Sequence, residues 1–222
     1  MNILQIFVDG TLTGLVYGLV ALAFVVIFRA SRIVNLAQGQ LVLLGAYVMG
    51  SLMTTLPLVV SISLALCVSV LVGIVIERMV FRPLIGQPAF SIVMASIGLL
   101  ILLQGLVQLV WGAQTRPFAV IFPEGALQFD TVIVNKRLLI GAGITVLAVE
   151  LLRLFFFKTR EGLRLAAVAE DHFIALSLGV SVQGATRVAW AAGAFLSTMA
   201  AMILLSGNVP VSYTHLTLPT KA

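Results

Sequence analysis

Charged residues are scarce in this chain, and their scarcity excludes most soluble folds. They make up 9% of the 222 residues, and hydrophobic residues make up 61%. Soluble domains carry about 25% charged residues, and one of this size could not bury so much apolar surface. The composition therefore predicts a membrane protein.

Cysteine is almost absent as well, and Cys67 is the single one in the sequence. It lies in an apolar run with no metal-ligand spacing around it, so we expect a small packed side chain, no metal site and no cofactor. The net charge is +5, but the basic residues form no stripe interleaved with aromatic ones. We therefore predict no nucleic-acid partner.

Long apolar runs are what the chain does contain. A helix needs about 20 mostly apolar residues to cross a bilayer. The runs of this length cover residues 4–28, 33–56, 58–80, 90–111, 138–157 and 188–206. No basic segment precedes the first run, so we interpret it as a retained helix and not as a signal peptide. The predicted fold is an all-α, polytopic bundle of about six transmembrane helices.

Basic residues fall mainly on alternate loops between these runs. One set of loops carries Arg29, Arg32, Arg78, Arg82, Arg153, Lys158, Arg160, Arg164 and Arg187. The other set carries Arg116, Lys136 and Arg137, offset by Glu124 and Asp130. Because cytoplasmic loops carry the excess of Lys and Arg, we predict a cytoplasmic segment over residues 158–187 and an external N-terminus.

Two features within the runs allow more than one interpretation. Glu150 lies three residues before Arg153, so an ion pair near the interface is expected, with a transport role as the alternative. Gly14 and Gly18 form a G-x-x-x-G pair, which brings helices close together in lipid. We expect packing within the chain at this pair, and a contact between two subunits is the alternative.

Amide side chains crowd the start of the second run. Asn35, Gln38 and Gln40 surround Gly39. Amides are costly in lipid unless they face protein or water, and glycine permits a break or a close approach. The residues alone leave two interpretations open. The helix is discontinuous and lines a substrate path, or it begins at the interface, where amides cap its first turn.

Several short motifs follow one another from about residue 10 to about residue 205. They are Tyr17-Gly18-Leu19-Val20-Ala21, the run from Ile33 to Gln40, Gly45-Ala46-Tyr47, Glu77-Arg78 with Phe81-Arg82-Pro83-Leu84, Ser96-Ile97-Gly98, the run from Thr159 to Arg164, Ala169-Glu170-Asp171 and Leu178-Gly179-Val180. Together they resemble the permeases of high-affinity branched-chain amino acid ABC transporters.

The resemblance implies an import function in a bacterial or archaeal cytoplasmic membrane. Such permeases work with a second permease subunit, ABC ATPase subunits and an extracytoplasmic substrate-binding protein. The chain has no G-x-x-x-x-G-K-[ST] phosphate loop, so ATP hydrolysis is expected on another chain and the subunit itself is no enzyme. The alternatives are a secondary transporter or channel driven by an ion gradient, and a membrane subunit without transport activity.

For the amide-rich start of the second run we adopt the substrate path, with Asn35, Gln38, Gly39 and Gln40 as its candidate residues. The resemblance implies a role for a second group of residues. It places ATPase coupling on a short helix in the segment 158–187. Gly162 and Gly179 are expected to bound that helix, and Arg164, Glu170 and Asp171 are expected to take part in the ATPase coupling. For the two acidic residues, a solvated helix face is the alternative.

The end of the chain departs from the family. Members continue for two or more helices after the sixth. Here residues 211–222 resemble the translation of a sequencing-library adaptor. We therefore expect an incomplete permease domain over 1–210 and a non-native tail over 211–222.

Overall fold

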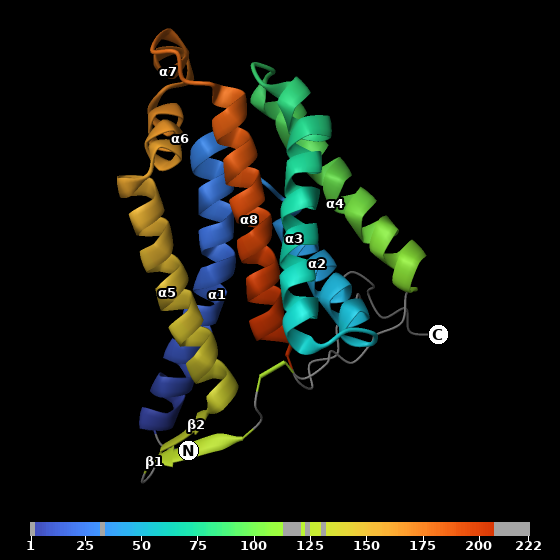
Figure 1. Cartoon of the computed structure of the whole chain (residues 1–222), viewed down its shortest axis with the longest axis vertical. Coiled ribbons are helices and arrows are strands. Elements are labelled where there is room, and N and C mark those ends of the chain that lie inside the picture. The colour runs from blue at the N-terminus through green and yellow to red at the C-terminus, as the bar shows by residue number, and fades with distance from the viewer. Residues whose placement is uncertain (1–2, 32–33, 113–120, 123–124, 130–131, 207–222) are drawn as a thin grey trace.

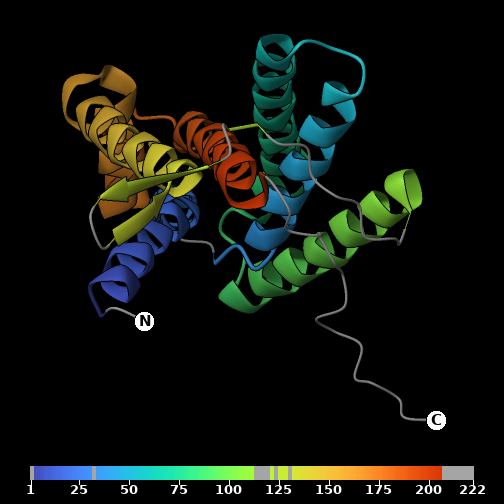
Figure 2. The same cartoon turned by 90° about the horizontal axis from the view of Figure 1, so that it is seen from below.

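The computed structural model describes residues 3–31, 34–112, 121–122, 125–129 and 132–206. The long helices form one bundle (Figure 1), and the view along the bundle in Figure 2 shows α4 strongly tilted relative to α8. The helices are α1 (Ile3–Ser31), α2 (Gln38–Met53), α3 (Leu58–Ile76), η1 (Glu77–Phe81), η2 (Arg82–Leu84), α4 (Ala89–Trp111), α5 (Lys136–Lys158), α6 (Arg160–Glu170), α7 (His172–Ser177) and α8 (Val182–Leu205).

The predicted all-α membrane bundle is confirmed. Among the described residues, five helices are long and apolar enough to cross a bilayer. They correspond to five of the six predicted runs. The run at residues 33–56 is the exception, because it forms the 16-residue helix α2. At a rise of 1.5 Å per residue α2 is about 24 Å long, which is shorter than the ~30 Å hydrocarbon layer.

A serine side chain explains why the last helix begins earlier than predicted. The apolar run suggested a start at Val188, but α8 begins at Val182. The Ser181 hydroxyl accepts a hydrogen bond from the Gly184 N–H at 3.1 Å. Such a cap satisfies one of the free N–H groups in the first helical turn. The polar residues before Val188 therefore extend the helix beyond its apolar part.

A β-hairpin occupies part of the segment that was predicted as a loop between the fourth and fifth runs. Strand β1 (Ala126–Phe129) pairs antiparallel with β2 (Val132–Asn135). The Gln5 side chain makes two hydrogen bonds with Ile133, donating to its carbonyl at 2.6 Å and accepting from its N–H at 2.7 Å. The first turns of α1 thus hold the hairpin in place.

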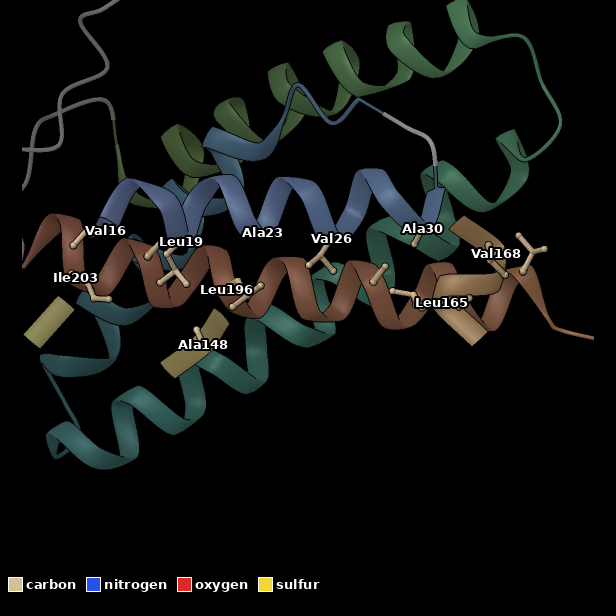
Figure 3. Packing of buried hydrophobic residues seen from close by; sticks show 14 of the residues in the cluster. Val16, Leu19, Ala23, Val26, Ala30, Ala148, Leu165, Val168, Leu196 and Ile203 are labelled. Atoms are coloured by element: carbon tan, nitrogen blue, oxygen red, sulfur yellow. The ribbon is translucent and has the colours of Figure 1, made fainter. Parts of the chain in front are cut away.

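Helix α8 is the centre of the bundle and packs against α1, α2 and α3. Glycines at several positions allow these close contacts. A Cβ at Gly73 of α3 would lie 2.5 Å from the Trp190 carbonyl oxygen, and one at Gly193 would lie 2.5 Å from the Ile27 side chain. Figure 3 shows the buried side chains between α1 and α8, including Leu19, Val26 and Leu196.

The expected packing at Gly14 and Gly18 within the chain is wrong. No described atom lies within 4 Å of a Cβ built at either position. The neighbouring Tyr17 is 60% exposed on the same helix. This face of α1 is therefore open.

The two ends of the bundle differ in composition. The α6 end comprises α6, α7, η1 and the N-terminus of α8, and the hairpin end comprises β1, β2 and the first turns of α1 (Figure 1). Eight of the nine basic residues predicted to share one side lie toward the α6 end, whereas Lys136 and Arg137 lie at the hairpin end. Arg32, Arg116, Glu124, Asp130 and the tail 211–222 lie outside the described residues.

Candidate functional site

The chain enters α2 through a short non-helical segment in which buried and exposed residues alternate. Asn35 is 1% exposed and Ala37 is fully buried. The Asn35 side-chain oxygen accepts the Ala37 N–H at 3.1 Å, and its backbone carbonyl accepts the Gln38 N–H at 3.2 Å. An asparagine that satisfies the backbone in this way holds a turn in place of a helix. This turn is why α2 begins at Gln38 and not at residue 33.

Three polar side chains form a buried hydrogen-bonded group, which we call the amide cluster: Asn35, Gln38 and Ser197. The Gln38 amide nitrogen donates to the Ser197 hydroxyl at 2.7 Å, and its oxygen accepts from the Asn35 amide at 3.2 Å. The Ser197 hydroxyl donates to the Gly193 carbonyl at 2.7 Å. Hydrogen bonds in such a low-dielectric interior reinforce one another, so the cluster links α2 firmly to α8.

The four residues predicted for the substrate path do not all meet at one point. Asn35 and Gln38 point into the bundle, whereas Gly39 is exposed and has no described atom within 4 Å of a built Cβ. The break in the helix therefore comes before Gly39, at residues 35–37, and no close approach requires this glycine. Gln40 is half-buried, and its side-chain oxygen has no hydrogen-bond partner among the described residues.

Sequence reasoning missed the contribution of α8 to this site. Ser197 and Thr198 are adjacent hydroxyl residues in the middle of an apolar helix, and this would have been the available signal. Both are buried, and the Thr198 hydroxyl lies against Gly45 of α2. Beside it is a cavity of about 10 Å³ between α2, α3 and α8. That volume is about what one water molecule needs.

A second polar connection joins the end of α3 to the start of α8. Glu77 is 1% exposed inside the bundle. One carboxylate oxygen accepts from the Thr186 hydroxyl at 3.1 Å, and the other has no partner in the described part of the chain. Arg82 donates to the Gln183 side chain, and the rings of Phe81 and Trp190 stack 4.5 Å apart. These contacts join η1 and η2 to the first turns of α8.

The predicted ion pair between Glu150 and Arg153 is confirmed. The Arg153 Nε and a Glu150 carboxylate oxygen are 2.8 Å apart. The two side chains are 60% and 52% exposed, for Arg153 and Glu150 respectively. Both charges therefore lie on the outside of α5 and not on an internal path.

Helix α6 is amphipathic and rests on the bundle. Leu165 and Val168 are buried against the core, while Arg164 pairs with Glu161 at 2.5 Å on the outer face. The Thr159 hydroxyl caps the helix by accepting the Gly162 N–H at 2.9 Å. A Cβ at Gly162 would lie 2.1 Å from the Phe155 carbonyl oxygen. Gly162 is thus needed for the sharp corner between α5 and α6.

The predicted single helix between Gly162 and Gly179 is wrong, because two helices fill this segment. Helix α6 ends at Glu170, and Asp171 adopts an extended conformation. The Asp171 carboxylate then accepts the Ile174 N–H of α7 at 3.0 Å. This hydrogen bond to the Asp171 side chain replaces a backbone hydrogen bond of a continuous helix, which explains why α6 and α7 are separate. Gly179 has φ of +75°, which glycine adopts at no steric cost, and it turns the chain toward α8.

Exposed apolar residues follow the two acidic ones along this segment. Glu170 is exposed and Asp171 is half-buried. Leu176 is 57% exposed and Leu178 is 73% exposed. The exposed side chains after Asp171 therefore include large apolar ones. The prediction named the carboxylates and missed the leucines.

These features define the class of the protein. It is a multi-pass membrane protein whose apolar helices surround a polar site, with amphipathic helices gathered at one end. The family described as "Branched-chain amino acid transport system / permease component" matches residues 6–220. The chain belongs to this family and is a membrane permease subunit of an ABC importer.

Curated relatives agree with this membership. The "High-affinity branched-chain amino acid transport system permease protein BraD" of Pseudomonas aeruginosa is 25% identical over 215 residues, covering 90% of this chain and 70% of the relative. The corresponding LivH proteins of Salmonella typhimurium and Escherichia coli are each 24% identical over 216 residues, with the same coverage. No solved structure matches the chain significantly.

Proposed function

We propose that this subunit conducts branched-chain or related amino acids inward across the cytoplasmic membrane, powered by ATP hydrolysis on separate ATPase subunits. The observation that carries the proposal is the amide cluster, a polar group inside an apolar bundle where α2 begins. Polar side chains at membrane depth are costly and commonly mark substrate pathways. The relatives' names, which specify branched-chain amino acid transport, support this substrate class.

The proposed path runs along α2 beside α8. Asn35, Gln38, Gly39 and Gln40 would supply polar contacts from one helix, and Ser197 would supply them from the other. The cavity at Gly45, lined mainly by apolar side chains together with Ser69 and Thr198, would meet the aliphatic side chain of the substrate. Its volume of about 10 Å³ is too small for an amino acid, so transport would require the surrounding helices to separate. An apolar pocket discriminates by only about 1–3 kcal/mol per methylene group, so related amino acids would share the path.

The α6 end is proposed to face the cytoplasm, with the N-terminus outside. The segregation of basic residues supports this orientation, because Lys and Arg are retained on the cytoplasmic side. The α6 end carries Arg29, Arg78, Arg82, Arg153, Lys158, Arg160, Arg164 and Arg187. The hairpin end would then face the extracytoplasmic binding protein.

The segment 158–187 is proposed to couple the ATPase to the bundle. Its exposed leucines and the carboxylates of Glu170 and Asp171 suit a cleft with apolar walls and basic rims. Helix α6 packs against α1, α5 and α8, and α8 continues from this segment to Ser197. Movement of the docked segment would reach the amide cluster through α8. ATP and substrate need only favour different packings of the bundle.

The second permease subunit is proposed to pack on the open face of α1. Gly14 and Gly18 leave a shallow surface there, with no described atom near a built Cβ. Small residues at such a surface let a helix of another subunit approach closely.

Reconstituted uptake tests the proposed function. The complete transporter, with its ATPase, partner permease and binding protein, is placed in liposomes, and uptake of labelled leucine is measured. We expect uptake that requires both ATP and the binding protein. The Gln38→Leu variant should lose most uptake while still binding the ATPase, and Gln128→Leu on β1 serves as the matched control. Uptake driven by an ion gradient without ATP would contradict the proposal.

The gradient-driven alternative finds one supporting residue. It requires a buried ionisable group, and Glu77 is the buried acid of the described chain. Glu150, the candidate suggested by the sequence, is half exposed and paired with Arg153. The ATP requirement in the uptake experiment separates the two functions.

A further inference from the structure

Two side-chain contacts join the short turns η1 and η2, at the end of α3, to the first turns of α8. The Glu77 carboxyl group accepts a hydrogen bond from the Thr186 hydroxyl at 3.1 Å. Arg82 donates to the side chain of Gln183. We call these two contacts the α3–α8 tie. Both of its α8 residues lie in the segment 158–187 that is proposed to couple the ATPase, so the tie is where that segment meets α3.

The stability of the bundle does not explain why an acid is buried in this tie. Glu77 is 1% exposed, and its second carboxyl oxygen has no partner among the described residues. No described lysine or arginine forms an ion pair with it. An unpaired polar atom inside a protein costs free energy, and apolar side chains of similar size often stabilise such a site better. A half-satisfied buried acid therefore points to a role beyond packing.

The hydrogen bond at Glu77 can be released without leaving the Thr186 hydroxyl unsatisfied. This hydroxyl lies 3.1 Å from the Glu77 oxygen and 3.2 Å from the Gln183 carbonyl oxygen of its own helix. A hydroxyl has one hydrogen to donate, so it serves either acceptor by rotating. Glu77 also begins η1, a π-helical turn, and such turns are rare and frequent at functional sites. The end of α3 is therefore joined to α8 by a contact with two available arrangements.

Helix α8 connects this contact to the amide cluster. Thr186 and Ser197 lie about three turns apart on α8, which is roughly 16 Å of continuous helix. Along this stretch, close packing at Gly73 holds α8 against α3, and close packing at Gly193 holds it against α1. Rigid elements with two discrete arrangements can carry coupling between distant sites. A displacement of the coupling segment would thus reach the amide cluster and α3 together while the tie is made.

We propose that Glu77 is a positioning residue for transport. Through Thr186 it makes α3 move with α8 when the coupling segment moves, so that α2 separates from both helices and the cavity at Gly45 opens. The transported amino acid does not contact Glu77, and the role of this acid is to transmit movement and not to pass an ion. The inference rests on the proposed ATP-driven function, in which two packings of the bundle alternate.

Uptake of labelled leucine per ATP hydrolysed tests this role in liposomes that hold the complete transporter. In Glu77→Met/Thr186→Val, apolar side chains of similar size replace the polar pair, so the melting temperature in detergent should not fall. Uptake per ATP should fall at least about fivefold, because coupling between sites is commonly of this size or larger. Thr186→Ser keeps the hydroxyl and should keep the native ratio. Thr145→Val is the matched control, because the buried Thr145 hydroxyl bonds to the Gly141 carbonyl within its own helix.

A stable double variant with the native ratio of uptake to ATP hydrolysis would overturn the proposal, because a merely structural role predicts that result. This outcome is distinct from a failure of the proposed function. If the unaltered transporter takes up leucine without ATP, the ATP-driven function itself is wrong, and the inference that rests on it is wrong as well.

A second measurement does not require the double variant to fold. Spin labels at exposed positions report two distances in chains that carry Cys67→Ser. One pair is Val75→Cys with Arg187→Cys, between α3 and α8, and the other is Leu36→Cys with Arg187→Cys, between the entry to α2 and α8. When ATP binds, the Leu36–Arg187 distance should change and the Val75–Arg187 distance should stay constant. A Val75–Arg187 distance that changes as much would overturn the proposal, as would two constant distances.

Discussion

The middle of α8 and its N-terminal end are built from different contacts. In the middle, Trp190, Gly193 and Ser197 are enclosed by three helices, and the packing leaves almost no space. At the N-terminal end, the two short helices α6 and α7 present exposed leucines and carboxylates. The comparison shows that one helix combines a tightly packed section, which holds the amide cluster, with an accessible section, which adjoins the segment proposed to contact the ATPase.

The largest expected effect comes from overpacking the tightly packed section. In Gly73→Leu the new side chain would meet the Trp190 backbone, which has no room to yield. Overpacking costs about 1–3 kcal/mol and more where the backbone must move, so we expect loss of the folded bundle. Gly105→Leu on α4, where no described atom is near, is the control. Equal melting temperatures in detergent for both variants would contradict the packing.

Breaking the amide cluster should have the next largest effect. Gln38→Leu leaves the buried Asn35 amide without its acceptor, which costs about 1–3 kcal/mol. Ser197→Ala removes the other end of the link. Because the two residues share one hydrogen bond, a double-mutant cycle should give a coupling of about 0.5–3 kcal/mol. Additive losses of stability would mean that the link contributes nothing.

The accessible section should respond differently. Glu170→Ala/Asp171→Ala should weaken binding of the ATPase by about 5- to 150-fold, because two carboxylates facing the proposed basic rim would contribute roughly 1–3 kcal/mol. Insertion into the membrane should not change, and the loss of the Asp171 cap on α7 should cost only about 1 kcal/mol of stability. Glu150→Ala, an exposed acid on α5, is the matched control. Unchanged ATPase recovery would refute the docking assignment.

The smallest effect is expected on the open face of α1. Gly18→Ala should stabilise the isolated subunit by about 0.5–1 kcal/mol, because alanine favours the helix and meets no neighbour. Gly14→Leu should leave the isolated subunit folded and weaken its pairing with the second permease. Pull-down of the partner permease from detergent extracts measures this. Loss of folding in Gly14→Leu would show that the face is occupied within the chain.

Local sequence features predicted several of these elements well. The length of the apolar runs led to five of the spanning helices, because lipid demands about 20 apolar residues from any helix that crosses it. The three-residue spacing of Glu150 and Arg153 predicted their ion pair. Such features depend only on neighbours along the chain. The caps at Thr159 and Ser181 also depend on local hydrogen bonds. The start of α8 after Ser181 was not predicted, because the apolar run begins only at Val188.

Tertiary contacts decided the remainder. Whether the amides of residues 35–40 meet lipid, water or protein depends on where α8 lies, and Ser197 is 159 residues away from Gln38. Burial of Glu77 likewise depends on Thr186, which lies 109 residues later. Contacts between residues so far apart leave no periodic pattern in the sequence. The polarity of residues 35–40 therefore pointed to a site, but it did not reveal which residues of other helices complete it.

The amino-acid sequence alone determined that this is a membrane protein and which segments are long enough to cross the bilayer, since both follow from the lengths of the apolar runs. It also determined which family the chain resembles, through short motifs. Only the tertiary structure decided that α2 begins at a turn beside α8, and that α8 supplies the polar partner for it. The physical reason is that lipid requires each spanning helix to be apolar over its own length, which can be read from one segment. Hydrogen bonds and close packing between helices depend instead on which helix faces meet.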